Sequence, residues 1–157
     1  MQYAVVGSVA SSARGSYRAT DDIDVLAEIL PEQAAALAEA LGQDWYADAQ
    51  QIRRALRARR AFNVIYIPFS QKVDIFSVID EFCAIQLRRA TNLPLPALGS
   101  DVEYPVTSAE DIVLAKPQWY KAGGEISDRQ WSDIVKVIRA TPQLVVSGRL
   151  GPAFASR

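Results

Sequence analysis

Apolar and polar positions alternate with two different periods along the first part of the chain, which predicts strands separated by helices. Tyr3 to Val6 is a short apolar run closed by Gly7, and it predicts a buried strand that ends in a turn. Residues 8–14 are small and compatible with a short helix, which Gly15 would end. Asp22 to Leu26 alternates between polar and apolar residues and predicts a second strand.

The middle of the chain continues this mixture of strands and helices. Pro31 suits a first helical turn, and the Ala- and Leu-rich stretch after it predicts a helix that ends at Gly42. The proline-rich stretch 93–99 favours either an extended linker or an edge strand. The other elements expected are a helix over 48–58, a hairpin of strands 62–67 and 72–78 joined by the turn 68–71, a helix over 80–89, and a strand over 102–106.

The last third of the chain has a helical pattern. Ser108 with Asp111 fits the capping-box pattern of a helix start. Apolar residues recur at helical spacing on both sides of Gly123-Gly124, so we expect two helices that pack as an antiparallel pair, the first kinked at Pro117. The residues after 140 show no periodicity and predict a loose tail.

These elements predict one domain of the α/β (α+β) class, with a mixed β-sheet flanked by helices and a C-terminal helical pair. The chain has 157 residues, of which 50% are hydrophobic, enough for one substantial core. Within that domain we expect a core over residues 1–106, the helical pair over 107–140, and the tail over 141–157.

Composition excludes several classes of function. The net charge of -1 leaves no global electrostatic footprint for nucleic acid or anionic lipid. With no histidine and Cys83 as the single cysteine, a Ser-His-Asp triad, a histidine-based zinc site and an internal disulfide are all ruled out. Neither a membrane-length apolar run nor a signal-peptide pattern is present, so we expect a bacterial-type cytoplasmic protein with no membrane partner.

Acidic residues on two predicted strands are the candidate metal ligands. Residues two apart on a strand point to the same face, so Asp22 and Asp24 place two carboxylates side by side while Ile23 turns into the core. Their mutual repulsion would be relieved by a divalent cation, and Mg²⁺ is the ion that prefers such oxygen ligands. Asp74, flanked by core residues on another predicted strand, could complete a two-metal site.

Gly7 and Ser8 are the candidate phosphate-binding residues. A glycine turn lets the backbone approach a phosphate closely, and the helix start after it offers N–H groups, to which Ser8 can add its hydroxyl. Arg18, between this turn and the aspartates, is a candidate phosphate clamp. Taken alone, Asp-x-Asp is typical of a solvated strand face and Gly-Ser of an ordinary turn, but their order and spacing favour a site.

The order Val5-Val6-Gly7-Ser8, then Asp22-Ile23-Asp24-Val25, then Lys72-Val73-Asp74-Ile75-Phe76 resembles the nucleotidyltransferase superfamily, which shares its fold with DNA polymerase beta. The family pattern is Gly-Ser or Gly-Gly, an acid-x-acid strand, and one more acid on a later strand. The resemblance implies that Asp22, Asp24 and Asp74 are both catalytic residues and magnesium ligands, and that Gly7, Ser8 and Arg18 bind the nucleotide.

Residues 108–116 and 123–134 are similar to the C-terminal helices of bacterial AbiEii-like and related small nucleotidyltransferases. In that group a helix lysine, here Lys116, would bind nucleotide, and a later aspartate, here Asp133, is a motif residue. Members usually carry a helix ahead of the first strand, whereas this chain begins directly on that strand, and Pro117 replaces an ordinary helix former. With the unpatterned tail, these departures suggest an incomplete or frame-altered member.

The resemblance implies a magnesium-dependent enzyme that transfers a nucleoside monophosphate from a nucleoside triphosphate such as ATP to a hydroxyl acceptor. The acceptor stays open among RNA, a protein hydroxyl and a small molecule. The alternative is a catalytically inactive nucleotide-binding or regulatory protein of a toxin-antitoxin-like system, acting with a partner protein from the same operon.

Overall fold

Seven strands form one mixed sheet in the computed structural model, which describes residues 1–15, 20, 22–95, 100–115 and 128–141. Their order across the sheet is β3-β4-β5-β2-β1-β7-β6. The pairs β2/β5 and β1/β7 are parallel and the other neighbours are antiparallel. The strands are β1 (Tyr3–Val6), β2 (Asp22–Ala27), β3 (Trp45–Tyr46), β4 (Phe62–Tyr66), β5 (Gln71–Ser77), β6 (Thr91–Leu95) and β7 (Ser100–Val106).

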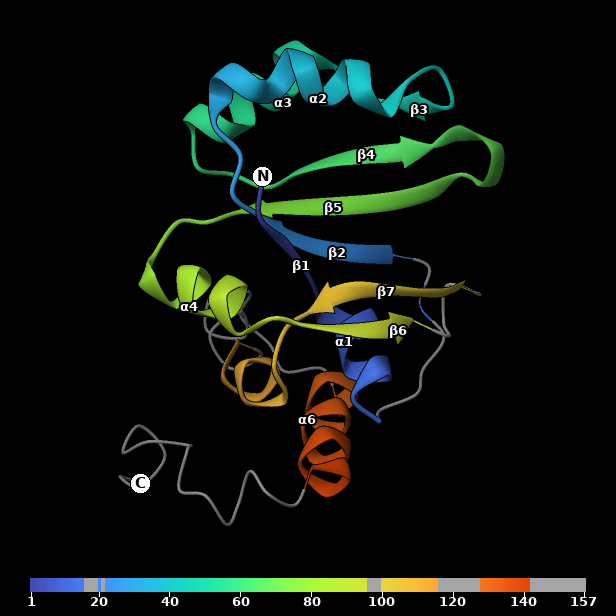
Figure 1. Cartoon of the computed structure of the whole chain (residues 1–157), viewed down its shortest axis with the longest axis vertical. Helices are drawn as coiled ribbons and strands as arrows, with labels where there is room; N and C mark the ends of the chain where they lie inside the picture. Colours follow the sequence, from blue (N-terminus) through green and yellow to red (C-terminus); the bar gives the residue numbers. More distant parts are fainter. Residues whose placement is uncertain (16–19, 21, 96–99, 116–127, 142–157) are drawn as a thin grey trace.

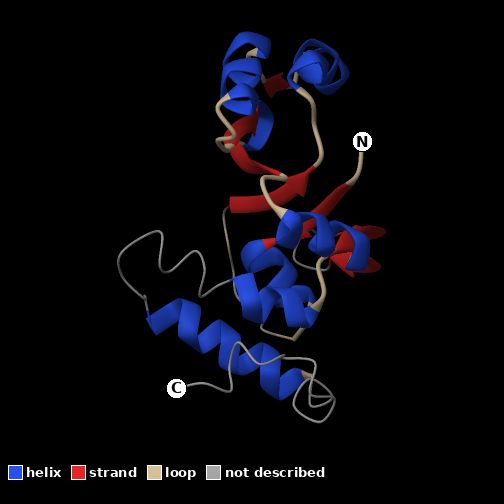
Figure 2. Cartoon of the chain, turned by 90° about the vertical axis from the view of Figure 1, so that its left-hand side faces the viewer, coloured by secondary structure: helices blue, strands red, loops and turns tan. Residues whose placement is uncertain are grey.

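Helices lie toward both ends of the sheet order. Figures 1 and 2 both place α2 and α3 at one end of the molecule and α6 at the other. The helices are α1 (Gly7–Ala13), α2 (Ala34–Leu41), α3 (Ala49–Arg57), α4 (Glu81–Arg89), an unlabelled helix over 109–115, and α6 (Asp128–Ala140), with single 3₁₀ turns η1 (Pro31–Gln33) and η2 (Ile67–Phe69). The predicted mixed sheet flanked by helices is therefore confirmed.

Local chemistry sets the ends of these elements much as the sequence predicts. Gly15 and Gly42, with φ of +99° and +77°, follow α1 and α2 in conformations that other residues rarely adopt. The hairpin turn between β4 and β5 contains η2 and Ser70, whose φ is +52°. The proline-rich segment does form an edge strand as far as Leu95, and its remaining residues, 96–99, lie outside the described part.

Ser108 and Asp111 make the predicted cap at the start of the helix over 109–115. The Asp111 backbone N–H donates to Ser108 Oγ at 3.1 Å, and the Ser108 hydroxyl donates to Asp111 Oδ2 at 2.7 Å. Asp111 is fully buried, and Arg89 Nη1 of α4 pairs with its Oδ1 at 3.3 Å. This contact ties α4 to the helix over 109–115, which stabilises the region that carries the C-terminal helices.

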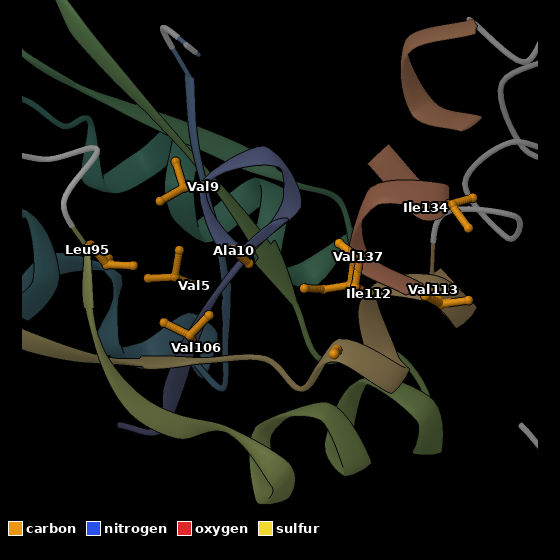
Figure 3. Packing of buried hydrophobic residues seen from close by; sticks show 10 residues of the cluster. Val5, Val9, Ala10, Leu95, Val106, Ile112, Val113, Ile134 and Val137 are labelled. Atoms are coloured by element: carbon orange, nitrogen blue, oxygen red, sulfur yellow. The ribbon is translucent and has the colours of Figure 1, made fainter. Parts of the chain in front are cut away.

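Two apolar clusters form the core. One joins β1, β7 and α1 to α6, and Figure 3 shows Ile134 and Val137 of α6 beside Ile112 and Val113. The other packs α2 and α3 against β4 and β5, with Ile52 and Val64 both at 2% exposure. The side chains of Ile23 and Val25 join these clusters, as predicted, so the alternate residues of β2 face the other way. The predicted antiparallel pairing and the Pro117 kink involve residues 116–127, which lie outside the described residues.

Candidate active site

Four charged residues share one face of the sheet where β2 and β5 pair in parallel. Asp22 stands opposite Lys72, and Asp24 stands opposite Asp74. Because residues two apart on a strand point the same way, all four side chains lie on the face opposite Ile23. The fold thus brings together the three aspartates that the sequence predicted, although Asp74 is fifty positions further along the chain than Asp24.

Gly7 lies directly against this group. Val6, the last residue of β1, is the register partner of Asp24, and α1 starts at the next residue. Gly7 has a φ of +64°, and a Cβ placed on it would overlap Asp24 Oδ2 and lie 2.7 Å from Asp24 Cγ. The sequence suggested glycine here for close approach of a phosphate. In the structure the close neighbour is the Asp24 carboxylate, so the need for glycine already arises from the protein's own side chain.

Asp24 is the most perturbed carboxyl of the site. Its pKa is raised to about 6, first by burial and then by the negative charges of Asp74 and Asp22. A hydrogen bond from the Ser8 backbone N–H and the charge of Lys72 lower that pKa, but they only partly offset the rise. A carboxylate pair held this close in a half-buried place favours a bound cation over two free anions.

Lys72 places a positive charge beside two of these carboxylates in the free protein. Its Nζ lies 2.8 Å from Asp74 Oδ2 and 3.4 Å from Asp22 Oδ1. The hydrogen bond to Asp74 is the main reason that the pKa of Lys72 is raised, with smaller contributions from both aspartate charges. Sequence reasoning missed this residue. Its position two before Asp74 put it on the same strand face, but its partner Asp22 follows only from the β2/β5 register.

The aspartates suit a hard divalent cation in donor type and share one face of the sheet. All three offer carboxylate oxygens, which Mg²⁺ prefers, and a cation would relieve the repulsion from Asp74 and Asp22 that, after burial, raises the pKa of Asp24. As the side chains stand, no group of three or more His, Cys, Asp or Glu within the described ranges is gathered tightly enough to hold a metal ion. Two of the three carboxylates are instead turned toward Lys72.

Comparison with known proteins identifies the fold. No family model and no curated protein matches this chain. Among solved structures, an antigenic nucleotidyltransferase-like protein from Paracoccidioides brasiliensis matches with a TM-score of 0.53 and 17% sequence identity, over 98% of this chain and 82% of that one. The chain has a nucleotidyltransferase-like fold. Because a fold alone does not establish an activity, the chemistry has to be argued from the site.

Three further residues had been assigned to the site from the sequence. Arg18 and Lys116 lie outside the residues that the structure describes, so their predicted nucleotide contacts stay predictions. Asp133 belongs to α6, whose Ile134 and Val137 pack into the cluster around α1, but its own side chain lies outside the described part. The assembled site of this nucleotidyltransferase-like fold therefore consists of Gly7, Ser8 and the four charged residues of β2 and β5.

Two further observations concern membrane-spanning helices and the single cysteine. Across the part of the chain that the structure describes, no helix is both long enough and apolar enough to cross a bilayer. Cys83 is a free, half-buried thiol on α4, and burial is the main reason that its pKa is raised. A raised thiol pKa lowers the thiolate fraction.

Proposed function

We propose that the protein is a magnesium-dependent nucleotidyltransferase, which moves a nucleoside monophosphate from a nucleoside triphosphate such as ATP to a hydroxyl acceptor. The observation that supports this most is the meeting of Asp22, Asp24 and Asp74 on one sheet face against Gly7. These residues would hold Mg²⁺, which when bound neutralises charge on the phosphates and on the leaving pyrophosphate. The nucleotidyltransferase-like fold supports the class of reaction and leaves the substrates open.

The two sides of the carboxylate group suggest separate places for the two substrates. On the β1 side, the backbone of Gly7 and Ser8 lies against Asp24. On the β4 side, Asn63 is the register partner of Asp74 and is exposed. The triphosphate would therefore lie toward Gly7 and Ser8, with Arg18 and Lys116 as proposed further contacts, and the acceptor would lie toward Asn63.

In this proposal Asp74 acts as the general base for the acceptor hydroxyl. Its carboxylate accepts a hydrogen bond from the acceptor hydroxyl and takes the proton as the oxygen attacks the α-phosphorus. The new bond joins that oxygen to phosphorus, and the bond from the α-phosphorus to the bridging oxygen breaks. Pyrophosphate leaves with the electron pair, and the proton passes from Asp74 to solvent. The acceptor stays open among RNA, a protein hydroxyl and a small molecule.

One observation favours the alternative, a nucleotide-binding regulatory protein without turnover. Lys72 already pairs with two of the three carboxylates, so the charge that a metal would supply is partly provided by the protein. Such a protein would act with a partner from the same operon in a toxin-antitoxin-like system. This setting and the AbiEii-like subgroup are both part of the proposal.

Pyrophosphate release tests the proposal directly. The protein is incubated with Mg²⁺, each of the four nucleoside triphosphates, and RNA, protein or small hydroxyl acceptors, and the products are identified by mass spectrometry. We expect Mg²⁺-dependent release of pyrophosphate with one acceptor class, and none from Asp74→Asn. A rise in thermal midpoint with Mg²⁺ and nucleotide but no pyrophosphate would favour the regulatory alternative. Neither a midpoint shift nor product would rule out both.

A further inference from the structure

Lys72 has a position that neither the fold comparison nor the proposed chemistry explains. It is the only ammonium or guanidinium group within 4 Å of these aspartates in the described part of the chain, with Nζ at 2.8 Å from Asp74 and 3.4 Å from Asp22. Its charge also acts on the neighbouring Asp24 carboxyl. One side chain thus offsets part of the negative charge of the group in which a metal would be held.

The ammonium and a divalent ion compete for the same oxygens. Nζ lies against Oδ1 of Asp22 and Oδ2 of Asp74, so a metal that takes these two oxygens has to displace the ammonium. A +1 charge beside a +2 charge also adds repulsion. The pairs are also weak enough to be exchanged. The side-chain exposures are 38% for Lys72, 55% for Asp22 and 25% for Asp74, and ion pairs with this much solvent contact each change an equilibrium constant by about fivefold or less. The long, partly exposed lysine side chain can move into solvent without leaving a buried charge behind.

We propose that Lys72 is an internal counter-ion of the metal-free site, which holds Asp22 and Asp74 in place and is displaced when a divalent cation binds. This inference rests on the proposed function, because it assumes that the aspartates take a metal. It makes Lys72 a positioning residue: it keeps three carboxylates assembled before substrate arrives, and it weakens binding of the metal by competing with it.

Direct metal binding tests the inference without any activity measurement. Mn²⁺ is the probe, and free Mn²⁺ is measured by electron paramagnetic resonance in the presence and absence of a nucleoside triphosphate. Lys72→Gln should bind Mn²⁺ alone about three- to tenfold more tightly than the parent, since the competing ion pairs are gone. Lys72→Arg keeps the positive charge and should behave like the parent.

Arg88→Gln is the matched control for the loss of one positive charge. Arg88 also makes a 2.8 Å ion pair, with Glu81, but on the exposed surface of α4. The Mn²⁺ affinity of Arg88→Gln should stay within about twofold of that of the parent, because screening weakens charge effects between exposed groups. In EDTA, Lys72→Gln should also melt at a lower temperature than the parent and Arg88→Gln, and saturating Mn²⁺ should close that gap.

Failure of the inference and failure of the proposed function have different signatures. If the parent binds Mn²⁺ with nucleotide while Lys72→Gln binds Mn²⁺ equally or more weakly, the function stands and the competition is refuted. If no variant binds Mn²⁺, with or without nucleotide, then both the metal site and the displacement are wrong. Unchanged melting of Lys72→Gln in EDTA would also refute the counter-ion role.

Discussion

The substitution Asp24→Asn tests whether the Asp24 carboxylate binds a cation or stabilises the fold. The parent carboxyl has a pKa of about 6 against an ordinary value of 3.8, because it is half-buried beside Asp74 and Asp22. Each pKa unit corresponds to about 1.4 kcal/mol, so the full shift sets an upper limit of about 3 kcal/mol. Asp24 keeps some solvent contact, and we expect roughly 1 to 2 kcal/mol after screening. Asparagine has nearly the same shape and can still accept the Ser8 N–H.

The sign of the effect depends on pH. Because the folded-state pKa is raised, the folded protein binds this proton more tightly than the unfolded chain does, and stability is lost as pH rises from about 4 through about 6. The amide in Asp24→Asn does not titrate in this pH range, so this loss of stability does not occur. The substituted protein should therefore match the parent near pH 4 and exceed its free energy of unfolding above pH 6.5.

Urea unfolding in EDTA at pH 4.5 and 7.5 measures this difference in free energy. In thermal unfolding at the higher pH, the midpoint should rise by about 2 to 8 °C. Asp74→Asn is the comparison variant, and it should gain less or nothing because it also loses the 2.8 Å contact with Lys72. Binding of Mg²⁺ with nucleotide should be abolished in Asp24→Asn. If the fold needs the charged carboxylate itself, Asp24→Asn should instead lose roughly 1 to 3 kcal/mol, and such a loss at both pH values with normal nucleotide binding would refute the reasoning.

Two further substitutions test the surroundings of the site by urea unfolding. Gly7→Ala should cost roughly 2 to 4 kcal/mol of stability and abolish nucleotide binding, because the new Cβ meets the Asp24 carboxylate at a φ of +64°. Gly42→Ala has a φ of +77° and nothing within 4 Å of its Cβ, so it should lose only about 1 to 3 kcal/mol through backbone strain and keep nucleotide binding. Equal binding in both would contradict this. Arg89→Ala should cost about 1 to 3 kcal/mol by leaving buried Asp111 without its cation, whereas exposed Arg88→Ala should change stability by under about 0.5 kcal/mol. Similar losses at both arginines would show that burial of the partner is unimportant.

Local signals in the sequence predicted most elements of the fold, because they depend on neighbouring residues. Alternation predicted β2 and β5, and glycines predicted the ends of α1 and α2. The pairing of β7 with β1 and of β5 with β2 joins segments far apart in the chain, and no local pattern specifies it. The mixed sheet was predicted as a class, but its strand order required the structure.

The same distinction holds at the site. Asp22, Asp24 and Asp74 could be found from the sequence because carboxylates between apolar strand residues are conspicuous. Lys72 could not, because a lysine near a strand start is ordinary until the register places it opposite Asp22. The overlap of a Gly7 Cβ with Asp24 also depends on tertiary contact. Residue type and spacing therefore predicted the ligands, and only the pairing of strands could show what balances their charge.

Two acidic residues show where this fold tolerates unfavourable electrostatics. Asp111 is fully buried, but it accepts from the Ser108 hydroxyl at 2.7 Å and pairs with Arg89 at 3.3 Å, so burial is compensated. Asp24 is less buried, yet it lies between two like charges, and its pKa rises to about 6 despite the Ser8 hydrogen bond. The two carboxyls therefore differ in how their charge is balanced: Asp111 has its own paired cation, whereas Asp24 is offset only in part, by the Ser8 N–H and by the charge of Lys72. Under the proposed function a bound divalent cation would relieve the repulsion that remains at Asp24, and Asp111 would need no such ion.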